Sequence, residues 1–282
     1  MAEGPTAPGT ATPPPPRTPT RLGRLAPYGI GASIALAAVL LVTVLTPAKP
    51  PLTQQEVDDA IAGALASVTP PPAYSQVVYQ AVQPSLVLIQ SKGLTDPKEN
   101  DEQKHDGLGS GVVVTMDGDI LTSLHVVDGA TDIELTFADG SKSPAEIVAT
   151  QPENDIAVVR ATDPPPVLIP ATLGNPGAVR QGSEAYALGS PFGLYGSVSA
   201  GVISGLDRSF TIPGTDRTLT GLFQIDAAVN PGNSGGALVD RNGRLIGIVT
   251  ALINPTDEDV FIGIGLAVPI DVAGGAAGLP PY

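Results

Sequence analysis

The order of apolar and polar residues divides the chain into an N-terminal segment with one long apolar run and a C-terminal region of short runs. Residues 28–46 are 19 mostly apolar residues without a charged side chain. As a helix they would extend roughly 29 Å, close to the ~30 Å hydrocarbon core of a bilayer. A buried core helix is the alternative, but an uncharged run of this length is more typical of a membrane span. We therefore expect a single transmembrane helix over residues 28–46.

The residues on either side of this run indicate how it would be oriented. Residues 1–27 hold eight prolines and few large apolar side chains, so they are expected to form a disordered tail. Arg17, Arg21 and Arg24 precede the run, and Lys49 follows it. This charge bias favours a cytoplasmic tail and an extracytoplasmic C-terminal region. A cleaved signal peptide is the competing interpretation, although no clear small-x-small cleavage site follows the run.

Residues 47–76 are expected to be a linker that contains a short amphipathic helix. Thr53 and Glu56 stand three residues apart, as a capping box requires. The helix could contact another protomer, or it could be a solvated spacer. The apolar residues that follow at helical spacing are Val57, Ile61, Leu65 and Val68.

From about Val77 onward, short runs rich in Val, Ile, Leu and Thr alternate with turn signals. A proline-rich break at residues 163–176 divides these runs into two comparable sets. The sequence predicts an all-β domain over residues 77–275, built from two β-barrels. The expected bounds are about 77–162 for the first barrel, 177–271 for the second and 276–282 for a tail. Asx-Gly pairs that suit tight hairpins are Asp117-Gly118, Asp139-Gly140 and Asn242-Gly243.

Composition narrows the possible functions. The 282 residues include no cysteine, which excludes disulfide frameworks, cysteine nucleophiles and thiolate metal sites. Two histidines, His105 and His125, leave little room for a histidine-rich metal site, and we expect neither a metal nor another cofactor. Since 14 basic residues face 28 acidic ones, the formal net charge of −14 disfavours nucleic acid as a partner.

Three polar residues in separate segments form a candidate catalytic set. His125 follows the strand-like LTSL, Asp155 precedes the apolar IAVV, and Ser234 lies within the glycine-rich NPGNSGGAL. Singly, these residues suggest a structural histidine, a surface aspartate at the start of a strand and a tight turn. Together they are the combination that activates a hydroxyl group for nucleophilic attack. The glycines also let consecutive N–H groups face one concavity, where an oxyanion could be held.

These segments resemble the HtrA (Deg) type of trypsin-like serine proteases over roughly residues 78–271. The resemblance implies two six-stranded chymotrypsin-like barrels with the active site between them. His125 and Asp155 would come from the first barrel and Ser234 from the second. The motifs that carry the resemblance are, in chain order, LTSLHVVDGA, ENDIAVVRA, ALGSPFG, SVSAGVISGLDR, QIDAAVNPGNSGGALVDRNGRLIGIV and GLAVPID.

The resemblance also implies roles for individual residues. Ser234 would attack the scissile carbonyl, His125 would transfer the proton, and Asp155 would orient the imidazole. Gly232 and Ser234 match the positions whose backbone N–H groups form the oxyanion hole. Ala228 matches the base of the primary substrate pocket, which favours cleavage after small or medium apolar residues. The family implies unfolded or misfolded polypeptides as substrates and a trimer as the homo-oligomer. A place in the bacterial envelope follows instead from the orientation of the expected span and from the low lysine content beside abundant Ala, Gly, Pro and Val.

Several features depart from the family or from related enzymes. About a dozen residues follow Asp271, whereas a PDZ domain needs on the order of 90. Leu124 stands where relatives more often have a smaller or polar residue, and Asn233 stands where digestive relatives carry an aspartate that binds a freed N-terminus. A catalytically silent anchored peptide-binding or chaperone module therefore stays open as the alternative function. Three loops also bear on activity. The acidic insert at residues 96–106 is expected to be a solvated loop, with a regulatory lid as the alternative. Residues 190–193 and 254–260 correspond to loops that the family orders upon activation.

Overall fold

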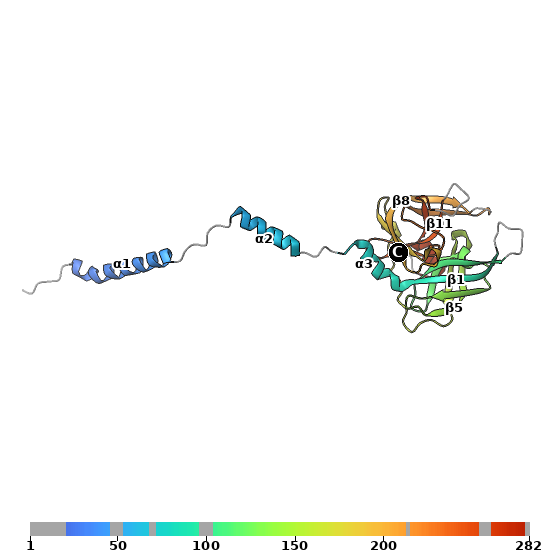
Figure 1. Cartoon of the computed structure of the whole chain (residues 1–282), viewed down its shortest axis with the longest axis horizontal. Helices are drawn as coiled ribbons and strands as arrows, with labels where there is room; N and C mark the ends of the chain where they lie inside the picture. Colours follow the sequence, from blue (N-terminus) through green and yellow to red (C-terminus); the bar gives the residue numbers. More distant parts are fainter. Residues whose placement is uncertain are drawn as a thin grey trace, which may run out of the picture. The chain divides into compact units, whose positions relative to one another are not determined.

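The computed structural model of this chain describes residues 21–45, 53–67, 72–95, 104–212, 215–253 and 261–279. The chain divides into two compact units, Met1–Pro70 and Pro71–Tyr282 (Figure 1). Several segments discussed above lie outside the described residues, namely 1–20 of the expected tail, 96–103 of the acidic insert, 254–260 and 280–282.

The first unit contains two helices, α1 (Arg21–Leu45) and α2 (Gln54–Ser67). The prediction that residues 21–27 belong to a disordered tail is wrong for their backbone, which is helical. Four of these seven residues are Arg or Leu, which have high helix propensity and let the helix extend upstream. Among the described residues, no helix combines the length and apolar character needed to cross a membrane. The membrane span over residues 28–46 therefore stays a prediction.

Helix α2 begins with the capping box that the sequence predicts. The backbone N–H of Thr53 donates to Glu56 Oε2 (2.8 Å), and the N–H of Glu56 donates to Thr53 Oγ1 (3.3 Å). These bonds satisfy two N–H groups that have no partner within the helix. The bonds that the Glu56 carboxylate accepts from the N–H and the hydroxyl of Thr53 lower its pKa, because they stabilise the charged form. The helix expected within the linker is thus confirmed.

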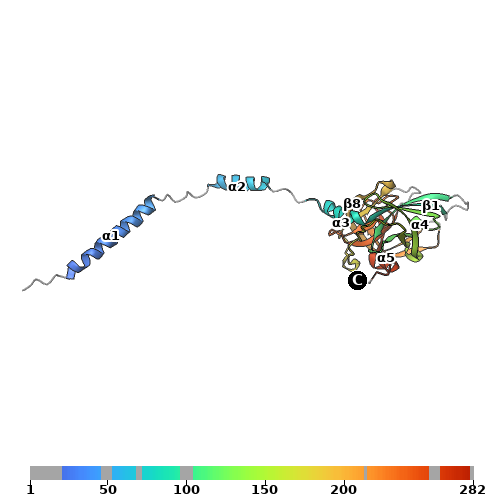
Figure 2. The same cartoon turned by 90° about the horizontal axis from the view of Figure 1, so that it is seen from below.

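The second unit is built from two closed antiparallel barrels of six strands each (Figures 1 and 2), which confirms the all-β prediction. The strand order is β1-β2-β3-β6-β5-β4 in the first barrel and β10-β11-β12-β9-β8-β7 in the second. The first barrel consists of β1 (Leu86–Thr95), β2 (Lys104–Val113), β3 (Asp119–Ser123), β4 (Asp132–Thr136), β5 (Lys142–Gln151) and β6 (Ile156–Ala161). The second consists of β7 (Glu184–Gly189), β8 (Ser197–Thr211), β9 (Thr218–Ile225), β10 (Ala237–Val239), β11 (Leu245–Leu252) and β12 (Gly265–Pro269).

Buried side chains fill the contact between the barrels as well as their interiors. One buried cluster joins side chains of both barrels, among them Leu121, Leu188 and Val268. Two further clusters fill one barrel each, around Ile120 in the first and Ile225 in the second. Every residue of β3 and β12 is buried, because these strands pack into their own barrel on one face and against neighbouring elements on the other. The two barrels are therefore held in one fixed arrangement along the face that carries the candidate site.

Two helices at the ends of this unit correct the sequence analysis, which expected an all-β domain from about Val77. Helix α3 (Tyr74–Val82) leads into the first barrel, and helix α5 (Ile270–Ala276) follows the last strand (Figure 2). α3 contains β-branched residues that suggested a strand, but Val78 and Val82 lie four positions apart and are both buried in the inter-barrel cluster. Tertiary packing of one helical face thus overrides the local β preference.

The three Asx-Gly pairs form hairpin turns, as predicted. Gly118, Gly140 and Gly243 have φ angles of 88°, 82° and 71°. Each lies between two antiparallel strands, β2 and β3, β4 and β5, or β10 and β11. A positive φ at these positions is tolerated without strain only by glycine, so these turns fix the hairpins in place.

Candidate active site

The candidate base lies on a one-turn helix. Strand β3 leads directly into α4 (Leu124–Val127), which places His125 at the end of the strand with 49% of its side-chain surface exposed. Leu124 is buried in the core of the first barrel, and its backbone N–H donates to the carbonyl oxygen of Asp155 (2.9 Å). Leu124, which stands where HtrA-type relatives more often have a smaller or polar residue, thus fits here as a core side chain.

Asp155 is the best-anchored side chain of the site. Its Oδ1 accepts from the backbone N–H of His125 (3.1 Å), and its Oδ2 lies 2.7 Å from His125 Nδ1. Oδ2 also accepts from the hydroxyl of Thr250 on β11 (2.6 Å). The residue is buried and has a left-handed backbone, with φ 53° and ψ 41°. A non-glycine residue in this region is strained, and its neighbours must hold it there.

The two members of this pair shift each other's pKa. Burial lowers the pKa of His125, but the Asp155 carboxylate and its hydrogen bond raise it by more, to above the ordinary 6.5. Burial raises the pKa of Asp155, but the charge of His125 and the hydrogen bonds from His125 and Thr250 lower it by more, to below 3.8. The carboxylate therefore stays ionised at neutral pH and favours a proton on the imidazole.

The Ser234 loop has a backbone that only glycine could form at two positions. Gly232 has φ 98°, and a Cβ there would lie 2.5 Å from the carbonyl oxygen of Ser190. Gly235 has φ 83°, and its Cβ would lie 2.1 Å from the carbonyl oxygen of Ser110. The loop is pinned to both barrels, since Ser110 N–H donates to Ser234 O (2.8 Å) and Gly235 N–H donates to Val249 O (2.7 Å).

Two backbone N–H groups of this loop are unused. Within the described ranges, neither the N–H of Gly232 nor that of Ser234 donates to a protein acceptor. The carbonyl oxygen of Pro231 accepts instead from the N–H of Phe192 (2.9 Å). In a trans peptide the C=O and N–H point in opposite directions, so this bond turns the Gly232 N–H away from Phe192. These two N–H groups are therefore available as donors, which an oxyanion hole would require.

The sequence analysis did not find two of the hydroxyl groups that form hydrogen bonds between the barrels. Ser110 Oγ donates to Gly232 O (2.7 Å) and accepts from Ser190 N–H (2.8 Å), and Thr250 binds Asp155. The glycines on both sides of Ser110 were a signal of close approach, because a Cβ at position 109 or 111 would lie 2.4–2.6 Å from side chains of Val126 or Ile120. Nothing in the sequence near Thr250 indicates its role.

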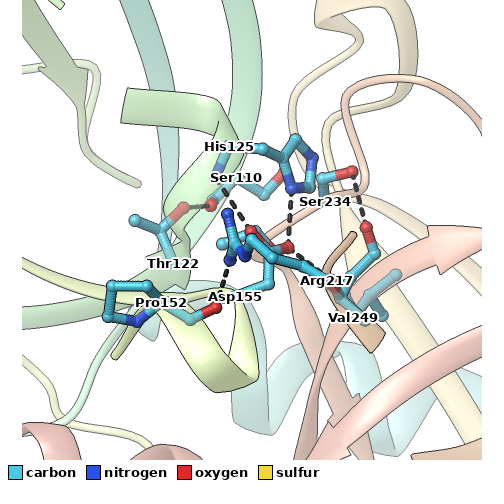
Figure 3. Close-up of polar contacts among 10 residues, drawn as sticks. Ser110, Thr122, His125, Pro152, Asp155, Arg217, Ser234 and Val249 are labelled. Atoms are coloured by element: carbon cyan, nitrogen blue, oxygen red, sulfur yellow. Dashed lines mark hydrogen bonds and ion pairs between the residues drawn. The ribbon is translucent and has the colours of Figure 1, made fainter. Parts of the chain in front are cut away.

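Ser234 and His125 lie near each other without a direct hydrogen bond. In Figure 3 the Ser234 hydroxyl lies beside the imidazole but points away from it. Its Oγ donates to the carbonyl oxygen of Thr250 at 3.4 Å, and none of the hydrogen bonds between described residues joins it to His125. Rotation about one side-chain bond would redirect the hydroxyl, and such bonds are often long or absent without substrate.

The structure describes the remaining residues that the sequence analysis singled out. Ala228 is exposed, and its carbonyl oxygen accepts from Ser199 Oγ on β8 (2.6 Å). Asn233 is buried, and its Oδ1 has no hydrogen-bond partner among the described residues. His105 belongs to β2, where its backbone pairs with Leu94.

Other potential binding features lie away from this site. Two cavities, of about 330 and 440 Å³, are lined by residues that include neither the Asp155–His125 pair nor Ser234. Within the described ranges, no group of three or more His, Cys, Asp or Glu side chains could hold a metal ion. The geometry thus brings together an aspartate–histidine pair, a serine and two N–H donors, which are the groups needed to activate a hydroxyl as a nucleophile.

Comparison with known proteins points to the same chemistry. Residues 109–248 match the family of trypsin-like peptidase domains. The periplasmic serine endoprotease DegP of Escherichia coli is 42% identical over 169 residues, which cover 60% of this chain and 34% of that protein. The serine protease PepD of Mycobacterium tuberculosis is 35% identical over 220 residues, which cover 72% of this chain and 45% of that protein.

A solved structure extends the comparison to three dimensions. The HtrA-type protease AlgW with a tripeptide is 33% identical, with a TM-score of 0.63 over 73% of this chain and 63% of that chain. The matches to the curated relatives cover less than half of those proteins' lengths. The family match at residues 109–248 includes strands of both barrels and the Ser234 loop. The two barrels therefore contain a trypsin-like peptidase domain that is similar to those of HtrA-type serine proteases.

Proposed function

We propose that this chain is a membrane-anchored serine endopeptidase that hydrolyses peptide bonds of unfolded or misfolded extracytoplasmic proteins. The observation that carries the proposal is the buried Asp155 carboxylate bound to His125 Nδ1, next to a serine whose loop has two free N–H donors. A purely structural histidine would not need a serine loop with free N–H donors beside it, and a tight turn around Ser234 would not need a buried aspartate–histidine pair. Their coincidence at the contact between two barrels supports catalysis.

The proposed reaction proceeds through an acyl-enzyme. Ser234 Oγ attacks the scissile carbonyl carbon while its proton passes to Nε2 of His125, and Asp155 stabilises the resulting imidazolium. The N–H groups of Gly232 and Ser234 bind the oxyanion of the tetrahedral intermediate. As the C–N bond breaks, His125 gives the proton to the leaving amine. Water then hydrolyses the ester by the same steps in reverse order, which restores the serine.

Substrate preference follows from Ala228 if this residue lies at the base of the primary pocket. A methyl group there leaves no charge to select lysine or arginine, so small or medium apolar residues before the scissile bond are preferred. Unfolded polypeptides suit such a site, because an extended segment is needed to enter a cleft between two barrels. DegP and PepD are named as serine proteases, which agrees with this activity class.

The membrane anchor and the oligomer complete the proposal. The uncharged run at residues 28–46, with three arginines before it and one lysine after it, supports a single-pass anchor with a cytoplasmic N-terminus. The protease domain would then face the outside of the cytoplasmic membrane. The family resemblance supports a trimer.

A second candidate function is favoured by the orientation of Ser234. Because its hydroxyl is directed to Thr250 and not to His125, the resting domain could bind peptides without cleaving them, as an anchored chaperone module. In that case the pair and the serine would not act as a unit. Proteolysis of an unfolded protein distinguishes the two functions.

The test is the cleavage of unfolded casein by the full-length chain. We expect cleavage by the wild type, no cleavage by Ser234→Ala, and unchanged cleavage by Ser141→Ala, which removes a serine hydroxyl in the β4–β5 turn. Product termini should begin after small or medium apolar residues. Binding of casein without cleavage, by the wild type and Ser234→Ala alike, would support the chaperone module instead.

A further inference from the structure

One cation reaches the candidate site from outside the predicted set. Arg217 lies at the end of the turn between β8 and β9, where its carbonyl oxygen accepts from the N–H of Ile212 (2.9 Å) and its N–H donates to Thr215 Oγ1 (3.2 Å). The backbone of Arg217 therefore closes this hairpin of the second barrel. Its side chain extends toward the first barrel, beside the Asp155–His125 pair (Figure 3).

The side chain of Arg217 binds the turn that carries Asp155. This turn is a short 3₁₀ segment, η2 (Pro152–Asn154), that ends at Asp155. The carbonyl oxygen of Pro152 accepts from Arg217 Nη2 and also from the backbone N–H of Asp155 (3.2 Å). A single acceptor thus connects the hairpin of one barrel to the strained aspartate of the other.

In the part of the chain that the structure describes, no carboxylate forms an ion pair with Arg217. The Nε of its guanidinium is buried without a hydrogen-bond partner among the described residues. In the described part of the chain, the charged groups that act on the His125 imidazole are Asp155, before β6, and Arg217, on the β8–β9 hairpin. Asp155 raises the pKa of His125, whereas Arg217 lowers it, because a nearby cation disfavours the imidazolium.

We propose that Arg217 is a positioning residue for the His125–Asp155 pair, which holds the Pro152–Asn154 turn from the opposite barrel and sets a cation beside the imidazole. The hydrogen bond keeps Asp155 in its left-handed backbone conformation, from which the carboxylate reaches both Nδ1 and the N–H of His125. The charge offsets part of the basicity that Asp155 gives to His125. Only the effect on catalysis rests on the proposed function, since the geometry and the charge act on the pair regardless of turnover.

A purely structural brace is the competing explanation. A brace would keep the hairpin in contact with η2 but would leave the protonation of His125 unchanged. Arginine can both donate the hydrogen bond and supply the charge. At position 217, glutamine keeps a donor without the charge, lysine keeps the charge, and methionine keeps only the length of the side chain. Arg180 offers a matched control, because its guanidinium also donates to backbone carbonyls, those of Gly177 and Val179, in the second barrel.

The decisive measurement is the titration of His125 by NMR in the full-length chain, labelled with ¹³C at the histidine Cε1. The chain has only two histidines, so His105→Gln assigns the His125 signal. We expect the pKa of His125 to rise in Arg217→Gln and in Arg217→Met, and to stay near the wild-type value in Arg217→Lys and Arg180→Gln. We also expect the low-field proton signal of the Asp155–His125 hydrogen bond to shift in Arg217→Gln.

An unchanged pKa of His125 in Arg217→Gln would overturn the proposal, and Arg217→Met decides the matter in the same way if the glutamine variant does not fold. The catalytic consequence is tested by the rate at which a fluorophosphonate labels Ser234, which should fall about tenfold in Arg217→Gln and not in Arg180→Gln. An equal rate would refute the positioning role. A wild type that takes up no label would refute the proposed protease, while the titration would still decide the role of Arg217.

Discussion

At the scale of single residues, the Asp155 carboxylate is the group that organises the candidate site. It accepts three hydrogen bonds, two from His125 and one from Thr250. A carboxylate buried to this degree would be costly without such partners, and with them it remains ionised. Its effect on the imidazole gives two predictions that concern individual side chains.

The first concerns pH. A general base must be neutral to accept the serine proton, and the pKa of His125 is raised by Asp155. Activity should therefore be low while the imidazole is protonated and should rise with pH through an apparent pKa above about 6.5. Measuring kcat/KM from pH 5 to 9 tests this, and a flat profile over that range would count against His125 as the base.

The second concerns Asp155→Asn. The amide keeps the size of the side chain but favours the wrong tautomer of His125, so kcat should fall roughly 10⁴-fold while the fold is retained. Asp119→Asn is a matched control, because Asp119 is a buried aspartate paired with Arg160 elsewhere in the first barrel. Steady-state kinetics and circular dichroism measure both effects. A loss below tenfold would remove Asp155 from the catalytic set.

At the scale of elements, strands and hairpins were predictable, whereas contacts between distant segments were not. Alternating Val, Ile and Leu runs with Asx-Gly turns encode local geometry, so the barrels follow from sequence. Helix α3 was missed because its helical form depends on burying Val78 and Val82 against the barrels. The hydrogen bond from Ser110 to Gly232 joins residues 122 positions apart, and no local pattern encodes such a bond. His125, Asp155 and Ser234 were predictable because their chemistry is recognisable as a set.

Ser110 gives a prediction at this scale, since it links β2 to two loops of the second barrel. Ser110→Ala should leave Ser190 N–H and Gly232 O unsatisfied, which costs about 2 kcal/mol of unfolding free energy. Loss of this anchor should also misplace the Gly232 N–H and lower kcat about tenfold. Urea unfolding and kinetics measure the two effects.

Ser143→Ala separates stability from positioning in this experiment. Ser143 is also buried, and its Oγ donates to Pro144 O and accepts from Asp163 N–H. Both partners lie in the first barrel or in the segment directly after its last strand, β6. We expect a similar loss of stability with unchanged kcat. Equal kcat in Ser110→Ala and the wild type would show that the Ser110 anchor does not position the oxyanion donors.

At the scale of the whole molecule, the chain combines a two-barrel trypsin-like domain with an N-terminal segment whose placement in a membrane is a prediction from sequence. Residues 28–46 should keep the chain in the membrane fraction through an alkaline carbonate wash, whereas deletion of these residues should release it. Cell fractionation followed by immunoblotting measures this. Recovery of the intact full-length chain in the soluble fraction would contradict the anchor.

The central claim is that Ser234, His125 and Asp155 act together on one carbonyl group. Its most direct test is mass spectrometry of the full-length chain after reaction with a fluorophosphonate. We predict one phosphonyl group, on the peptide that contains Ser234, and far slower labelling when Asp155 is replaced by asparagine. A wild-type protein that stays unlabelled, or one that is labelled as fast without the Asp155 carboxylate as with it, would contradict this account.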